Sequence, residues 1–192
     1  MRKVPTLFVR DPDNMSRVLN EVNPAAAWVL DGNGAATRKY DGTPVMLDDD
    51  SRWWARREVK PEKKPPAGFE AVETDLITGK TVGWEPIEQS PFVKFWREAL
   101  GNPYERRRIG TYELLGPKVN GNPENVGGHV LWWHNDAEIL KDVPLDYDGL
   151  AEYLRDFKGE GVVWHEGVRS AADVMREGAR MAKLKRRDFG YT

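Results

Sequence analysis

The alternation of apolar and polar positions along the chain predicts short strands more often than helices. Several runs of four to eight residues are rich in Val, Ile, Thr, Tyr, Phe and Trp and are bounded by Gly, Pro, Asn or Asp, which is typical of strands. Strands are expected at residues 6–9, 28–30, 36–40, 53–59, 69–73, 81–84, 109–115, 130–134, 161–165 and 181–186, with a further strand that begins near Pro44-Val45.

Fewer stretches have the spacing of an amphipathic helix. Helices are expected at residues 15–22, 91–100, 150–157 and 171–177. Asn14 or Ser16 would cap the first and Asn23-Pro24 would end it, while Ser90 would cap the second and Asp148 the third. Many antiparallel strands with a few flanking helices predict an α+β fold, which we expect to form a single domain over residues 1–192.

The composition is that of an ordinary globular protein, with 31% charged and 40% hydrophobic residues. No apolar run approaches the ~20 residues that a membrane helix needs, and no apolar segment suited to a signal peptide follows the basic start. The chain has no cysteine, which excludes disulfides, thiolate catalysis and cysteine-bound zinc. We therefore expect a soluble, cytoplasmic protein without membrane partners.

The net charge of −2 does not favour nucleic acid, but the basic residues are unevenly distributed. They gather at Arg56-Arg57, Lys60, Lys63-Lys64, Arg106 to Arg108, and Lys183 with Lys185 to Arg187. Such clusters bind phosphates even when the whole chain is near neutral. Solvated faces and linkers explain the first two groups equally well. The eight tryptophans suit a core or a base-stacking surface.

The stretch from Ala35 to Val45 places Lys39 directly before Asp41-Gly42, a strong hairpin turn signal. Lys-x-Asp-Gly at a strand end is the arrangement with which covalent nucleotidyltransferases aim a lysine amine at the α-phosphate of a nucleotide. The alternative is an exposed lysine beside a hairpin turn. Which interpretation holds depends on whether partner motifs follow in the right order.

Such motifs follow in order. They are Lys39-Tyr40-Asp41-Gly42, then Arg56 or Arg57, then Tyr112-Glu113-Leu114-Leu115-Gly116, then Glu160-Gly161-Val162-Val163, and finally Lys183-Leu184-Lys185. The series resembles that of the covalent nucleotidyltransferase superfamily, and within it the ATP-dependent RNA ligases. The resemblance implies the adenylation-domain fold of ligases, with antiparallel sheets and flanking helices.

Two departures from the superfamily pattern matter. DNA ligases and capping enzymes usually carry an arginine two residues after the glycine, where this chain has Pro44, and this favours the RNA ligase branch. Those enzymes also have an oligonucleotide-binding (OB) barrel after the last lysine motif, whereas only residues 186–192 follow here. We therefore expect one adenylation domain without an OB-fold domain, acting alone or with an accessory protein.

The chemistry explains the residue types independently. A lysine that attacks phosphorus must be neutral, although its ordinary pKa is near ~10.4. Lys183 and Lys185 are two apart on a predicted strand and would share one face, from which they could lower the pKa of Lys39 and neutralise phosphate charge. A basic tail is the alternative. By the resemblance, Glu113 would contact the ribose and Glu160 a divalent metal, with Glu113 a weaker metal candidate; structural ion pairs are the alternative.

Two positions stay ambiguous because adjacent strand residues face opposite ways. Of Arg56 and Arg57, we predict Arg56 at the nucleotide. Of Trp132 and Trp133, we predict that Trp133 stacks on the adenine, with core packing as the alternative. Lys118 and the arginines at 106 to 108 are further candidates for phosphate contacts.

The leading hypothesis is an ATP-dependent RNA ligase that uses ATP and Mg²⁺ or Mn²⁺. Lys39 would take AMP from ATP, pass it to an RNA 5′-phosphate, and allow a 3′-hydroxyl to displace it. We expect a monomer in the cytoplasm of a bacterial or phage-infected cell. The alternatives are another covalent nucleotidyltransferase, of the DNA ligase or capping type, and a non-catalytic RNA-binding module that has kept the fold.

Overall fold

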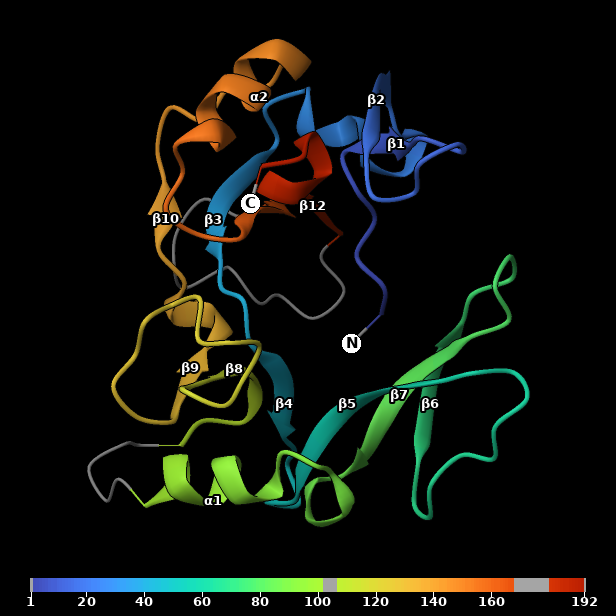
Figure 1. Cartoon of the computed structure of the whole chain (residues 1–192), viewed down its shortest axis with the longest axis vertical. Helices are drawn as coiled ribbons and strands as arrows, with labels where there is room; N and C mark the ends of the chain where they lie inside the picture. The colour runs from blue at the N-terminus through green and yellow to red at the C-terminus, as the bar shows by residue number, and fades with distance from the viewer. Residues whose placement is uncertain (1, 102–106, 168–179, 192) are drawn as a thin grey trace. The chain divides into compact units, whose positions relative to one another are not determined.

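The computed structural model describes residues 2–101, 107–167 and 180–191, which form two compact units. The first unit comprises residues 1–3 and 41–133, and the second comprises residues 4–40 and 134–192. The chain passes from one unit to the other after Lys3, after Tyr40 and after Trp133. Figure 1 labels both α-helices and most of the strands of the two units.

The first unit is built on a six-stranded antiparallel sheet with the order β6-β7-β5-β4-β8-β9. Its strands are β4 (Thr43–Leu47), β5 (Trp53–Val59), β6 (Glu70–Thr74), β7 (Thr81–Pro86), β8 (Gly110–Leu115) and β9 (Val130–Trp133). The short 3₁₀ helix η2 (Ile87–Gln89) and the helix α1 (Val93–Leu100) lie between β7 and β8 in the sequence.

The core of the first unit lies between this sheet and α1. Val45 and Tyr112 are opposite each other on β4 and β8, so they share a face of the sheet, and both are buried with Trp96 and Ala99 of α1 in one hydrophobic cluster. The alternating residues of β4 and β8, Pro44 and Glu113, therefore lie on the face that α1 does not cover.

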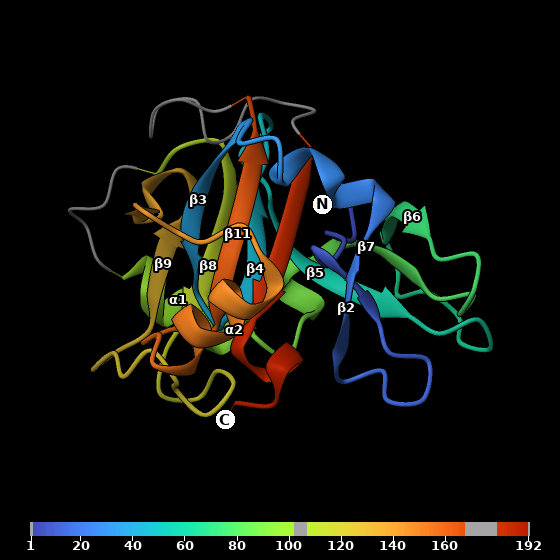
Figure 2. The ribbon, with the colours of Figure 1, turned by 90° about the horizontal axis from the view of Figure 1, so that it is seen from above.

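The second unit contains a four-stranded antiparallel sheet with the order β10-β3-β11-β12, in which Figure 2 shows β3, β11 and β12 side by side. The strands are β3 (Gly34–Lys39), β10 (Ile139–Leu140), β11 (Gly161–Glu166) and β12 (Met181–Lys185). A separate ribbon pairs β1 (Phe8–Arg10) with β2 (Val18–Val22). The remaining elements are η1 (Pro24–Val29), η3 (His134–Asp136), α2 (Tyr147–Arg155) and η5 (Arg186–Phe189).

The structure confirms the α+β class, with mostly antiparallel sheets and few helices. The predicted strands 53–59, 109–115, 161–165 and 181–186 match β5, β8, β11 and β12 within a residue at each end. Each of these runs carries aromatic or aliphatic residues typical of strands, so its own composition identifies it. The specific nucleotidyltransferase fold and the single-domain organisation stay predictions.

Two N-terminal predictions are wrong. Residues 15–22 contain β2 rather than a helix, because Val18–Val22 pairs with β1, and Asn14 instead closes a turn by accepting a hydrogen bond from the Ser16 amide. Asn23-Pro24 begins an element instead of ending one. Asn23 accepts from the Ala25 amide and Pro24 opens η1, which extends to Val29 where a strand was predicted.

The prediction of a hairpin at Asp41-Gly42 is also wrong. β3 pairs with β10 and β11, whereas β4 pairs with β5 and β8, so the turn carries the chain from one sheet to another. The N-cap of α2 is Asp146, which accepts a hydrogen bond from the Gly149 amide, and not Asp148. The helix predicted at residues 171–177 lies outside the described residues.

Candidate functional site

Three neighbouring strands of the second unit bring Lys39 and Lys185 to one rung of the sheet. In the register of this sheet, Gly161 on the central strand β11 is opposite Lys39 on β3 and also opposite Lys185 on β12. Directly opposite residues of antiparallel strands lie close together, and here the residue between them is a glycine. An added Cβ on Gly161 would collide with the Leu184 carbonyl, so this rung requires glycine.

Glu160, the residue before this glycine, joins the two lysines. The Lys39 Nζ lies 2.5 Å from Glu160 Oε2, and the Lys185 Nζ forms an ion pair with Glu160 Oε1. The side chains of Lys39, Glu160 and Lys185 are 21%, 10% and 11% exposed. Lys39 Nζ also donates to the Tyr40 carbonyl at 3.4 Å. The sequence motifs containing Lys39, Glu160 and Lys185 therefore converge on one ion-paired cluster.

The charges of this cluster shift the pKa of two of its groups. Burial raises the pKa of Glu160, but Lys39 and Lys185 outweigh it and the net pKa is lowered. Burial lowers the pKa of Lys185, and the positive charge of Lys39 lowers it further against the opposing effect of Glu160. With two ammonium groups for one carboxylate, the cluster carries one excess positive charge, which suits a phosphate.

Lys183 lies on β12 two residues before Lys185, so both lysines project from the same face of the strand. Its partner across the ladder is Val163, and its backbone also bonds to residues 5 and 7, which cover the outer edge of β12. The side chain is half-buried. The predicted sharing of one face by Lys183 and Lys185 is confirmed.

Asp41 and Gly42, which follow the candidate lysine, belong to the first unit. The Gly42 amide donates to Glu113 Oε1 at 3.1 Å, and Glu113 is buried, with 6% of its surface exposed. A Cβ on Gly42 would collide with the Leu114 carbonyl, which explains why this position needs glycine. The buried strand glutamate thus has the polar partner that its burial demands.

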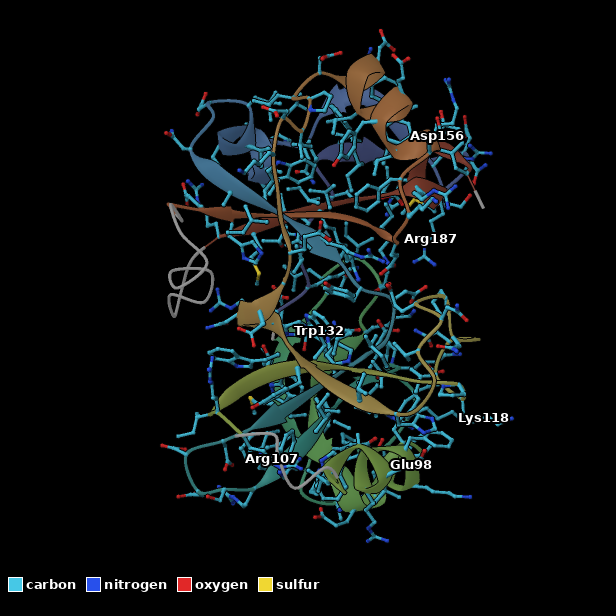
Figure 3. All side chains as sticks on the ribbon, turned by 90° about the vertical axis from the view of Figure 1, so that its left-hand side faces the viewer. Glu98, Arg107, Lys118, Trp132, Asp156 and Arg187 are labelled. Atoms are coloured by element: carbon cyan, nitrogen blue, oxygen red, sulfur yellow. The ribbon has the colours of Figure 1, made fainter. Side chains whose placement is uncertain are left out.

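The register of the first sheet decides which of the ambiguous pairs share a face with Glu113. Trp132 is directly opposite Glu113, whereas Trp133 is opposite Tyr112 on the core face, with the Arg108 guanidinium 4.4 Å from its ring centroid. Figure 3 labels Trp132 on β9.

The two arginines of β5 lie on opposite faces of the same sheet. Ala55 is opposite Val45 on the core face, so the adjacent Arg56 projects to the Glu113 face. Arg57 projects to the other face, where its guanidinium lies 3.9 Å from the buried Glu85 carboxylate. Arg56, Glu113 and Trp132 therefore lie on one face of the sheet, the one that α1 leaves uncovered.

The other residues predicted to contact phosphates lie at separate places in the first unit. Arg107 donates to the Leu100 carbonyl at 2.5 Å, next to the end of α1, and Arg108 lies over Trp133. Lys118 is exposed in the loop after β8 (Figure 3). Arg106 lies outside the described residues.

Sequence reasoning missed two groups of residues. His165 on β11 is buried, and its Nε2 lies 3.0 Å from the Thr37 hydroxyl. Asn120 and Glu124, in the loop after β8, bond to Asp41 and Gly42. The only sequence signal for the loop was its density of Asn and Gly, which indicated a turn and not a contact.

Glu160 is chemically suited to a divalent metal, because Mg²⁺ prefers carboxylate oxygens. Both of its oxygens are engaged by ammonium groups, so a metal ion would have to replace one of these lysines. Within residues 2–101, 107–167 and 180–191, no group of three or more His, Asp or Glu side chains could hold a metal by itself. None of the helices in these ranges is long and apolar enough to cross a membrane.

Comparison with known proteins finds distant similarity to RNA ligases. The chain is 24% identical to RNA ligase 1 of Mus musculus, over 60% of this chain and 47% of the relative. It is also 24% identical to RNA ligase 1 of Pongo abelii, over 59% of this chain and 46% of the relative. The chain thus spans about half the length of the curated relatives it matches. No family model matches the chain.

Proposed function

We propose that this protein is an ATP-dependent RNA ligase that adenylylates itself on Lys39. The observation that carries the proposal is the partly buried cluster in which Lys39 lies 2.5 Å from Glu160, with Lys185 on the other carboxylate oxygen. The distant similarity to RNA ligase 1 supports the choice of RNA ends as substrate.

In the first step, Lys39 Nζ attacks the α-phosphorus of ATP. A bond from nitrogen to phosphorus forms, the bond from the α-phosphorus to the bridging oxygen breaks, and pyrophosphate leaves. The amine must first lose a proton, which Glu160 Oε2, at hydrogen-bond distance, would accept and pass to solvent before the carboxylate binds a cation. Lys185, which forms an ion pair with the other oxygen of Glu160, then offsets the negative charge that develops on the phosphate.

A divalent cation, when bound, would neutralise charge on the departing pyrophosphate, and Glu160 is the carboxylate in this unit that we assign to hold it. Glu160 is ion-paired with Lys39, so the Lys39 amine becomes available for attack only when the carboxylate moves away from it. The same carboxylate would therefore hold the lysine in the resting enzyme and change partner when the nucleotide arrives.

We further propose that Arg56, Glu113 and an aromatic residue contact the nucleotide, with Glu113 on the ribose. For base stacking we favour Trp132 over Trp133, because Trp132 shares the face of Glu113 while Trp133 packs on the core side. The remaining steps transfer AMP to an RNA 5′-phosphate, after which a 3′-hydroxyl attacks that phosphate and releases AMP.

The experiment is intact-protein mass spectrometry after incubation with ATP and Mg²⁺, compared with GTP and with Mn²⁺. Wild type should gain one AMP, and Lys39→Ala should gain none. Lys94→Ala, which removes an exposed lysine on α1, is the matched control and should behave as wild type. Hydroxylamine should remove the adduct, because it is a phosphoramidate.

The outcomes separate the remaining possibilities. An adduct that survives Lys39→Ala would refute the assignment of the nucleophile. A GMP adduct in place of AMP would indicate a capping-type enzyme. No adduct under any of these conditions, combined with salt-dependent RNA binding, would replace the ligase proposal with a non-catalytic RNA-binding module.

A further inference from the structure

The loop between β8 and β9, residues 116–129, is stabilised by its own side chains. Val119 is buried in the core of the first unit, which anchors the loop. The Asn122 side chain makes two hydrogen bonds to the backbone of Val126. Its Nδ2 donates to the Val126 carbonyl and its Oδ1 accepts from the Val126 amide, each at 3.1 Å. Left-handed backbone angles, which asparagine tolerates better than most residues, occur at Asn120, Asn122 and Asn125. The loop therefore presents its side chains from a fixed backbone.

Two side chains of this loop hold the turn at Asp41-Gly42. Asn120 Nδ2 donates to Asp41 Oδ1 at 2.9 Å and to the Gly42 carbonyl at 2.8 Å. Glu124 Oε1 accepts from the Asp41 amide at 3.0 Å. The Gly42 amide in turn donates to Glu113. A chain of hydrogen bonds within the first unit thus runs from the loop, through the turn, to the buried carboxylate.

We infer that Asn120 and Glu124 are positioning residues for self-adenylylation, acting through Asp41 and Gly42 on Glu113. The inference rests on the proposed function. An isolated turn of this kind would be free to rotate, because neither Asp41 nor Gly42 belongs to a strand. The hydrogen bonds fix the Asp41 amide, the Gly42 carbonyl and the Asp41 side chain when the protein folds. The entropy cost of ordering the turn is therefore met on folding and does not add to the barrier of the reaction. Asn120 satisfies two of these groups and Glu124 a third.

The test compares Asn120→Asp with Asn125→Asp. Aspartate has nearly the shape of asparagine and tolerates the same left-handed backbone, but it cannot donate, and at position 120 it would face the Asp41 carboxylate. Asn125 is exposed, and its side chain makes no hydrogen bond within the part of the chain that the structure describes, so it is the matched control. Asn120→Gly, which keeps the backbone angle accessible, is a second variant in case Asn120→Asp does not fold.

The rate of adduct formation on Lys39 is measured against ATP concentration. Asn120→Asp should lower kcat/KM by roughly 10- to 100-fold, with a raised apparent KM for ATP, because two hydrogen bonds are lost. Asn125→Asp should remain within about twofold of wild type. Amide hydrogen exchange at Gly42 should become faster in Asn120→Asp alone, a change that a general loss of stability would not confine to this turn.

Three results would overturn the inference. They are a wild-type rate in Asn120→Asp and Asn120→Gly, an equal loss in Asn125→Asp, and a slower reaction without faster Gly42 exchange. Failure of the wild-type protein to form any adduct would refute the proposed function, and the inference with it. That outcome is recognised from the wild type alone, before any variant is compared.

Discussion

Lowering the pH should destabilise the protein through His165. This residue is 5% exposed, and burial lowers its pKa from 6.5 to about 4, with a smaller contribution from His134. Its Nε2 lies 3.0 Å from the Thr37 hydroxyl, which donates to the Val163 carbonyl at 3.2 Å. A neutral ring that donates from Nε2 satisfies both bonds at once, whereas the protonated ring would be charged and buried.

The sign follows from the two pKa values. Between pH 6.5 and about 4, His165 is protonated in the unfolded chain and neutral in the folded one, so the unfolded state binds the extra proton. The stabilisation is complete above pH 6.5 and is lost as the pH falls toward 4. The full difference corresponds to about 3 kcal/mol at 1.36 kcal/mol per pKa unit, of which about 2 kcal/mol is lost by pH 5.

Urea unfolding of wild type and His165→Gln at about pH 7.5 and about pH 5 measures this loss. Glutamine can keep a hydrogen bond to Thr37 but does not titrate, and the carboxylates that also titrate near pH 5 are common to both proteins. The loss of unfolding free energy should therefore be about 2 kcal/mol larger in wild type. Equal losses, within about 0.5 kcal/mol, would refute the argument. If His165→Gln does not fold, NMR titration of wild type decides, since the ring should stay neutral at pH 5.

Two further predictions concern the candidate site. Glu160→Gln removes the carboxylate between Lys39 and Lys185, so the rate of adduct formation should fall by about 100-fold or more because the proton acceptor is lost. The rate is measured by following the AMP adduct over time with mass spectrometry. An unchanged rate would contradict the role of Glu160 as proton acceptor. Gly42→Ala should reduce the unfolding free energy by about 1–3 kcal/mol, because its Cβ would collide with the Leu114 carbonyl. Gly127→Ala, where nothing lies within 4 Å, is its control in chemical denaturation and should change stability by less than about 0.5 kcal/mol.

The sequence predicted those elements whose own pattern decides them. The strand 53–59 carries two tryptophans and a terminal valine, and the strand 109–115 is mostly apolar around Thr111 and Glu113, so each can be identified without knowledge of its partners. The strand β2 has only one fully buried side chain, Val18, and three exposed ones, so its extended form depends on pairing with β1. Propensity alone could not predict that pairing.

Some residues of the candidate site could be predicted from the sequence and others could not. Motif order predicted Lys39, Glu160 and Lys185 in one nucleotide site, but with Glu160 on a metal and not on the lysines. The sheet register explains why the three residues meet, with Gly161 opposite both lysines. The contacts of Asn120 could not be predicted, because they join residues that are 78 and 79 positions apart. A turn-forming composition predicts where the chain bends but not which groups it will hold.

The strand order of the second unit also has a consequence for biosynthesis. β3 is complete at Lys39, yet its neighbours β10 and β11 begin at Ile139 and Gly161, so this strand emerges from the ribosome long before either partner exists. The continuous segment 41–133 contains every strand of the first sheet and can pair as it is made. Because long-range pairing is slow and waits for distant residues, we expect Lys39 to meet Glu160 late in folding. The proposed nucleophile would then acquire its partner Glu160 only after most of the chain has been synthesised.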